Sequence, residues 1–261
     1  MVPLKLVMEI CATPEAVREN IAATLRRPYQ GFMDLVGTRK GEIAICGFGP
    51  SLVNTCERIT GDSLACNGAH DYLISRGIIP TFGMFFDASE VIADFITPHP
   101  DVCYLIASRC HPAVFEKLEG YKVVVWHCKG DACIDEMLGE AELMEPMVHG
   151  GSAGVTRALF VAHAMGYRTL HIHGADSSYD GETTHVKKSL VHEEHLDVWV
   201  KTPDGEGKWF KTTPQLAAQV EDWKMLAPQL DQIGAQYVIH GHGLLPHVAG
   251  VLGYEVRGDE P

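Results

Sequence analysis

Glycine and polar residues follow several apolar runs of this chain, and their types are suited to binding anions and moving protons. The groups are Gly47, Gly49, Pro50 and Ser51 in "GFGPSL" (47–52), Asn67, Asp87, then Gly150, Gly151 and Ser152, and finally Asp176 and His185 in "GADSSYDGETTH" (174–185). In open parallel sheets, ligands bind beyond the carboxyl ends of the strands. We therefore expect these residues to gather at one edge of a sheet.

The turn at 47–51 places backbone amides at the start of a helix, where an anion can bind. It is not a dinucleotide fingerprint, because Leu52 stands where the third glycine is required and Asn67 stands where an acidic residue is expected. Pro50 donates no N–H, so an anion would depend on neighbouring amides and on the Ser51 hydroxyl. A plain strand-to-helix corner remains the alternative.

A second helix start, at Gly150, Gly151 and Ser152, has the same properties. The glycines allow a ligand to approach the backbone, Ser152 can cap the helix, and the amides carry partial positive charge. The same small residues would also suit close packing of a helix on a sheet. We expect ligand contact here and keep the packing role as the alternative.

Asp87 and Asp176 each follow an apolar run, in "FFDAS" and "HGADSS". Two carboxylates at one edge can hold Mg²⁺ against phosphates or bind ribose or substrate hydroxyls, whereas each alone can simply cap a helix. His185 lies on a glycine-containing loop and has the pKa range of a general base. We expect Asp87, Asp176 and His185 to be catalytic, with both aspartates as metal ligands.

The elements that must position these residues alternate between strand and helix from about residue 41 to the end. This pattern predicts an α/β fold: a Rossmann-like, mostly parallel sheet with helices on both faces. Thr13 and Pro14 begin a helix over 13–27, within a predicted N-terminal appendage (1–40) that precedes the main domain (41–261).

Residues 195–213 interrupt the alternation, because two β-prone runs flank Asp204 and Gly205. This pattern predicts a β-hairpin insertion. The aromatic side chains of Trp199, Trp209 and Phe210 would either cover a ligand or pack the hairpin onto the body.

Composition excludes several classes of protein. The net charge is −13 and lysine and arginine form no block, so nucleic-acid binding is not expected. The chain has no run of eighteen apolar residues and no signal-peptide pattern at its N-terminus, so we expect a cytoplasmic protein that does not enter a membrane. Eight cysteines without a C-x-x-C pair indicate buried free thiols, and the 14 histidines show no standard zinc spacing.

Three segments together resemble the MptE-like 6-hydroxymethylpterin diphosphokinase family, which includes domains of bacterial motility accessory proteins linked to flagellin glycosylation. The segments are "GFGPSL" (47–52), "NGAHDYLISRGIIPTF" (67–82) with Asp87, and "GGSAGVTRALFVAHAMGYRTLHIHGADSSYDGETTH" (150–185). The resemblance runs from about Gly41 to Val186. It implies a nucleotide on the 47–52 turn, with Asn67, Asp87, Ser152, Asp176 and His185 as site residues. A similar turn occurs in bacterial sialyltransferases, which use CMP-sugars.

The resemblance implies a nucleotide-dependent transferase that moves diphosphate from ATP, with Mg²⁺, to a hydroxymethyl group of pterin type. A glycosyltransferase with a CMP-activated sugar and a nucleotide-binding module without catalysis are the alternatives. The expected partners are a small-molecule nucleotide and an acceptor, and a homo-oligomer is plausible.

Overall fold

A parallel β-sheet forms the centre of the protein in a computed structural model that describes residues 12–131, 133–186, 195–202 and 204–258. Its spatial order is β1-β6-β5-β4-β3-β2-β8-β11-β12, and β7 pairs with β6. The strands are β1 (Gln30–Gly31), β2 (Glu42–Cys46), β3 (Ser63–Cys66), β4 (Phe82–Phe85), β5 (Cys103–Ala107), β6 (Val123–Cys128), β7 (Met147–Val148), β8 (Thr169–His173), β11 (Gln236–His240) and β12 (Glu255–Arg257). The predicted Rossmann-like α/β fold is confirmed.

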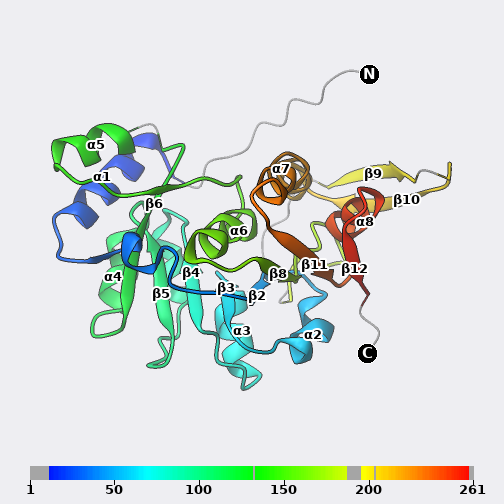
Figure 1. The fold of residues 1–261 in the computed structure, drawn as a ribbon, viewed down its shortest axis with the longest axis horizontal. Helices are drawn as coiled ribbons and strands as arrows, with labels where there is room; N and C mark the ends of the chain where they lie inside the picture. Colours follow the sequence, from blue (N-terminus) through cyan, green and yellow to red (C-terminus); the bar gives the residue numbers. More distant parts are fainter. Residues whose placement is uncertain (1–11, 132, 187–194, 203, 259–261) are drawn as a thin grey trace.

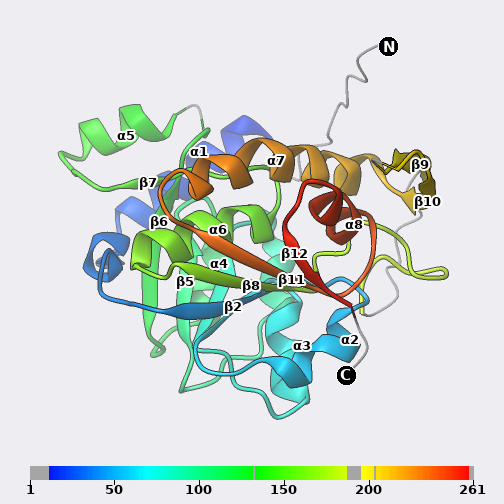
Figure 2. The ribbon, with the colours of Figure 1, turned by 45° about the vertical axis from the view of Figure 1, so that its right-hand side comes forward.

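Helices cover both faces of this sheet (Figure 1). The helices of the described chain are α1 (Pro14–Leu25), α2 (Leu52–Thr55), α3 (Ala69–Ser75), α4 (Pro112–Lys117), α5 (Ile134–Glu140), α6 (Gly154–Met165), α7 (Pro214–Asp231) and α8 (Leu244–Val251). Figures 1 and 2 both place α6, α7 and α8 on one side of the sheet and α2 and α3 on the other. Two further segments of the chain, η2 (Cys56–Arg58) and η3 (Glu90–Phe95), are 3₁₀ turns.

The ends of the helices follow from local sequence. The Thr13 hydroxyl accepts a hydrogen bond from the Ala16 amide at 3.2 Å, and Pro14 begins α1 as predicted. Thr213 caps α7 in the same way through the Leu216 amide at 3.2 Å. Helix α6 ends at Gly166, whose φ of 117° requires a residue without a side chain.

Alternation along the central strands sends side chains to two separate clusters. Ile43 and Ile45 of β2 belong to the large core beneath α6, whereas Ala44 and Cys46 pack with α2 and α3. In the parallel register Ala44 lies beside His171, and Cys46 lies beside His173. The two histidines of β8 therefore face the α2 and α3 side of the sheet.

The predicted hairpin is confirmed as an antiparallel pair, β9 (Leu196–Lys201) and β10 (Gly207–Thr212). Trp199 and Trp209 contact each other at 5.2 Å between ring centroids, and both are largely exposed, whereas Phe210 is buried 5.1 Å from the His247 ring. Phe210 packs the hairpin onto the body. A role for the tryptophan pair over a ligand stays a prediction.

The N-terminal part of the described chain contacts the main body directly. Strand β1 adds to β6 in the same sheet, and α1 packs on α4 and α5. The boundary predicted at residue 40 stays a prediction. Within the described residues, seven cysteines are free and six of them are buried, and no helix there is long and apolar enough to span a membrane.

Candidate functional site

The candidate site lies where the order of the strands reverses. Strands β2 and β8 are neighbours, but the chain continues from β2 to β3 on one side and from β8 to β11 on the other. The loops that follow β2 and β8 therefore leave the sheet in opposite directions, which is the position where open α/β sheets bind ligands. The 47–51 turn and the 174–178 loop are these two segments.

The two loops are in direct backbone contact. The Gly47 amide donates to the His173 carbonyl and the Gly49 amide donates to the Gly174 carbonyl, both at 2.8 Å. A Cβ at residue 47 would lie 2.5 Å from the Gly174 oxygen, and one at residue 49 would lie 2.6 Å from Oδ2 of Asp176. Both glycines are thus required by close packing between loops, whether or not a ligand contacts them.

Asp176 holds the start of helix α2. Its Oδ2 accepts from the Ser51 amide at 2.7 Å, and its Oδ1 accepts from the Ser51 hydroxyl. Asp176 is 2% exposed, and the carboxylate lies where an anion would meet the N-terminal amides. These contacts favour a structural role for Asp176 and leave Ser51 engaged within the protein. Pro50 immediately precedes this contact.

Asn67 ends β3 in a conformation that is uncommon for a residue with a side chain. Its φ is 48°, its amide donates to the Met84 carbonyl at 3.1 Å, and its carbonyl accepts from the His70 amide at 3.0 Å. Oδ1 is buried and has no hydrogen-bond partner among the described residues. Most buried polar atoms are paired, so this oxygen indicates a missing donor such as a bound ligand.

The beginning of α6 lies against Asn67. A Cβ at Gly154 would be 3.8 Å from Nδ2 of Asn67 and 4.0 Å from the Phe86 ring. Val155, the next residue, meets Gly47 from the same side, because its Cγ2 would be 2.8 Å from a Cβ there. The structure therefore brings the 47–51 turn, Asn67 and the α6 N-terminus together.

The carboxylate of Asp222 binds the turn at residues 150–152, which precedes α6. Oδ2 of Asp222 accepts from the Ser152 amide at 2.6 Å and from the Ser152 hydroxyl at 2.7 Å. It also packs on Gly151, where a Cβ would lie 2.5 Å away, and Gly150 has a φ of 125°. The sequence did not point to Asp222, because this residue lies 70 positions later, in the middle of α7.

Phe48 connects Asn67's turn to the segment that carries His185. Its ring would meet a Cβ at Gly68 at 2.7 Å and lies 6.0 Å from the His185 ring. The Phe48 carbonyl accepts from the Val186 amide at 3.0 Å, and Nδ1 of His185 lies 2.9 Å from the Thr184 hydroxyl. His185 is thus fixed beside the 47–51 turn, as a base for this site would need to be.

Asp87 follows β4 as predicted and is half-buried, and its Oδ1 accepts from the Ser89 amide at 2.9 Å. Among the described residues, no group of three or more His, Cys, Asp or Glu could hold a metal ion. Mg²⁺ commonly has one or two carboxylates and completes its shell with phosphates and water. Asp87 fits such a role better than Asp176, whose two oxygens are both bonded to Ser51.

A buried charged cluster beyond Asp87 was missed by the sequence reasoning. Nη1 of Arg109 contacts Oδ1 of Asp131 at 2.8 Å, and the guanidinium groups of Arg109 and Arg157 lie over the Phe86 ring at 5.8 and 5.4 Å. Both Nε atoms and Oδ2 of Asp131 are buried without a partner among the described residues. Arg109 lies two residues after β5 and Asp131 lies three residues after β6, so a search of the residues after each strand could have found them.

The fold and the loops at its switch point define a Rossmann-like α/β protein with a doubly wound sheet. The chain belongs to the 6-hydroxymethylpterin diphosphokinase MptE-like family, whose model matches residues 16–182. The predicted family resemblance is confirmed. No curated protein matches the sequence of the chain.

Comparison with solved structures finds a similar fold in one glycosyltransferase and weaker alignments with two sialyltransferases. A MAf glycosyltransferase from Magnetospirillum magneticum AMB-1 aligns at 14% identity with a TM-score of 0.64, over 98% of this chain and 39% of that one. This chain therefore spans well under half the length of that protein. A mammalian sialyltransferase aligns at 12% identity and TM-score 0.37 over 69% and 71% of the two chains. A Campylobacter jejuni sialyltransferase with cytidine-5'-monophosphate aligns at 12% and 0.32, over 84% and 85%.

Proposed function

We propose that the protein is a transferase with a nucleotide donor, and that it moves diphosphate from ATP to a hydroxymethyl group of pterin type. The family supports the transferase class, because it is named for a diphosphokinase. Its model matches residues 16–182, which include the 47–51 turn, Asn67, Asp87 and the 174–178 loop. The observation that carries nucleotide binding is Asn67, whose buried Oδ1 lacks a donor beside the α6 N-terminus. An amino or hydroxyl group of a nucleotide supplies such a donor.

In this reaction the acceptor hydroxyl oxygen bonds to the β-phosphorus of ATP. The bond between that phosphorus and the α,β-bridging oxygen breaks, and AMP leaves with the electron pair. The acceptor loses its hydroxyl proton, for which His185 is the proposed base. The phosphates need positive charge and alignment more than covalent help. The guanidinium groups of Arg157 and Arg109, which lie over the Phe86 ring, are the proposed source of positive charge.

Asp87 is the proposed protein ligand of Mg²⁺, because it is half-buried beside the strand end and only its Oδ1 is used by the Ser89 amide. Bound Mg²⁺ would neutralise part of the phosphate charge. Asp176 supports the site indirectly, by fixing Ser51 and the turn before α2.

Glycosyl transfer from a CMP-activated sugar is the second candidate. It is favoured by one observation, the similarity of nearly the whole chain to the fold of the MAf glycosyltransferase. The same nucleotide position and the same base would serve, with the bond between the sugar and CMP broken in place of the phosphate link.

Product analysis separates these activities. ATP, Mg²⁺ and 6-hydroxymethylpterin are incubated with the protein, and a parallel reaction contains a CMP-sugar and a sugar acceptor. AMP formation that requires the pterin and falls at least about a hundredfold in His185→Ala supports the proposal. Release of CMP with transfer of the sugar would replace it with the second candidate. Nucleotide binding without turnover in either reaction would indicate a nucleotide-binding module without catalysis.

A further inference from the structure

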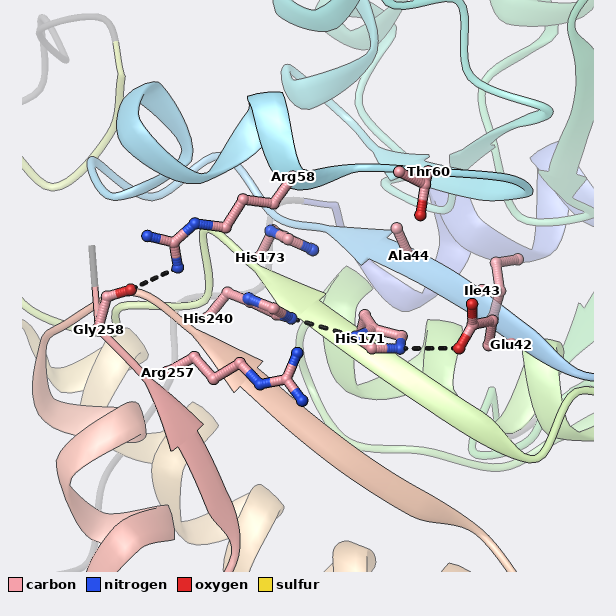
Figure 3. A pocket seen from close by; sticks show the side chains of 10 residues that line it. All are labelled: Glu42, Ile43, Ala44, Arg58, Thr60, His171, His173, His240, Arg257 and Gly258. Carbon is pink, nitrogen blue, oxygen red and sulfur yellow. Dashed lines mark hydrogen bonds and ion pairs between the residues drawn. The ribbon is translucent and has the colours of Figure 1, made fainter. Parts of the chain in front are cut away.

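A cavity of about 690 Å³ lies on the α2 and α3 side of the sheet, and no residue of the 47–51 turn or the 174–178 loop is among its lining residues. The charged and imidazole side chains in its lining are those of Glu42, Arg58, His171, His173, His240 and Arg257. Figure 3 shows the three imidazoles standing on β8 and β11, with Arg58 on one side of His240 and Arg257 on the other. The volume is in the range of small-molecule sites.

The histidines gather there because of strand register. His173 and His240 occupy paired positions on adjacent parallel strands, and their rings stack at 4.2 Å with planes 5° apart. His171, two residues earlier on β8, points to the same face. Three imidazoles on the buried part of a sheet face are costly unless their nitrogen atoms find partners.

Neighbouring side chains provide hydrogen-bond partners for both ring nitrogens of His171 and for Nε2 of His240. Nε2 of His171 lies 3.3 Å from Oε2 of Glu42, and Nδ1 of His171 lies 3.1 Å from Nε2 of His240. The carboxylate places the His171 proton on Nε2, so Nδ1 of His171 accepts the proton of His240. In the neutral form, Nδ1 of His240 then carries a lone pair.

The Nδ1 atoms of His173 and His240 differ from these nitrogens. Nδ1 of His173 and Nδ1 of His240 are buried without a hydrogen-bond partner among the described residues, and the two side chains belong to residues 1% and 4% exposed. Two unpartnered polar atoms in the wall of one cavity indicate that a ligand completes their hydrogen bonds.

The charges around the cavity favour an anion. The guanidinium groups of Arg58 and Arg257 both act on His240, whose pKa falls to about 4 because of burial first and then the neighbouring His171 and the two arginines. Burial and the adjacent imidazoles likewise lower the pKa of His173 to about 3. A negative ligand would be attracted by the two guanidinium groups, and it would favour the protonated form of His240 beside them.

A metal ion fits less well. Both ring nitrogens of His171 are already engaged, and the described residues include no metal-holding group of three. Arginine side chains, which cannot be deprotonated, disfavour a cation but bind tetrahedral oxyanions through their planar fork.

We propose that this cavity binds a phosphate group, held between Arg58 and Arg257, and that His240 takes up a proton when the anion binds. The added proton turns Nδ1 of His240 from a lone pair into a donor. The anion raises the pKa of His240 from its lowered value, so binding strengthens as the pH falls. The site is independent of the proposed transferase reaction.

The other ionisable groups around His240 modify this response. Glu42 on β2 contacts His171, and Glu255 on β12 contacts Nε and Nη2 of Arg257 at 2.8 and 2.7 Å. Nη1 of Arg58 donates to the Gly258 carbonyl at 2.6 Å. The carboxylates oppose anion binding, whereas the guanidinium groups favour it.

Calorimetric titration at constant ionic strength tests the site. Inorganic phosphate, diphosphate and AMP are titrated at pH 7 into the wild type, Arg58→Gln, Arg257→Gln and a matched control, Arg18→Gln. Arg18 is an exposed arginine on α1 that pairs with Glu136. Binding of at least one ligand should weaken at least about tenfold in both cavity variants and stay unchanged in the control. The ligand that binds most tightly distinguishes a free phosphate from an organic one.

Sulfate keeps its charge from pH 8 to 5.5, so its titration isolates proton uptake by the protein. Affinity should rise by up to tenfold per pH unit, and this rise should disappear in His240→Gln. Equal phosphate affinity in the wild type and both arginine variants would overturn the site, as would no binding of any of the three ligands. Asn67→Gly is titrated in the same way, and a phosphate signal that is lost only in this variant would assign the binding to the candidate site and also overturn this one. Sulfate affinity independent of pH would overturn the proton step.

Discussion

The Asp176 carboxylate bonds to both the amide and the hydroxyl of Ser51, two residues separated by 125 positions in the sequence. This contact joins the loops after β2 and β8 at the switch point of the sheet. It places a buried negative charge at the start of α2, where the turn could otherwise receive an anion from solution. The candidate ligand position thus shifts toward Asn67 and the beginning of α6.

Removing the contact should destabilise the fold and loosen the 47–51 turn. Asp176→Ala leaves the Ser51 amide without its buried acceptor, so we expect the free energy of unfolding to fall by ~1–3 kcal/mol. Urea denaturation of Asp176→Ala, Ser51→Ala and the double variant measures the coupling. The two losses should be clearly less than additive, because the variants remove one shared interaction. Strict additivity would show that Ser51 and Asp176 act separately.

Any side chain at residue 49 should lower the free energy of unfolding. A Cβ there would lie 2.6 Å from Asp176 Oδ2 and 2.7 Å from the Gly174 carbonyl oxygen. Gly49→Ala is therefore expected to lower the free energy of unfolding by ~1–3 kcal/mol. Gly139→Ala is the matched control, because a Cβ at residue 139 of α5 meets no atom within 4 Å. Equal stability of the two variants would contradict this packing.

Acid should weaken the fold through the buried histidines. His240 and His173 have folded pKa values of about 4 and about 3, whereas unfolded histidines titrate near ~6.5. The folded chain binds fewer protons in that window, so stability is complete above pH ~6.5 and falls as the pH falls toward ~4. Each histidine contributes a slope of up to ~1.4 kcal/mol per pH unit.

Denaturant unfolding at several pH values, in buffers without phosphate, measures this slope. His240→Gln should reduce it, while Arg18→Gln, at an exposed residue of α1, should leave it unchanged. A slope that is identical in His240→Gln and the wild type would contradict the assignment to His240.

The buried pair between Arg109 and Asp131 should be sensitive to loss of one partner. Their side chains are 17% and 8% exposed, and burial raises the pKa of Asp131 even with the arginine present. Arg109→Gln should lower the free energy of unfolding by about 3 kcal/mol at neutral pH, because it leaves a buried carboxylate unpaired. The loss should diminish at lower pH, where Asp131 is protonated. Full recovery of stability in Arg109→Gln with Asp131→Asn would agree with this account, and no recovery would oppose it.

Much of the architecture follows from alternation in the sequence. Apolar runs such as "IAICGF" and "TLHIHG" predict buried parallel strands, and the intervening amphipathic segments predict the helices. Short additions to the sheet were not predicted. Strands β1 and β7 have only two residues each, and β12 has three, so their periodicity is too short to be recognised.

The candidate site was predicted in part. Because strand ends converge, residues such as Asn67 and Asp87 could be selected from the sequence, and the structure places Asn67 beside the α6 N-terminus. The internal carboxylates on the two glycine-containing turns could not be foreseen. Asp222 reaches Ser152 from the middle of α7, and nothing in the local sequence of a helix indicates a partner 70 residues away.

Nucleotide titration of Asn67 variants tests the central claim most directly. ATP and CMP are titrated calorimetrically into the wild type and Asn67→Gly, a substitution that removes the side chain but tolerates the φ of 48°. Asn54→Ala, at an exposed residue of α2, is the control. We expect binding of one nucleotide to weaken at least about tenfold in Asn67→Gly and to stay unchanged in Asn54→Ala. Equal affinity in all three proteins would contradict a nucleotide site at Asn67.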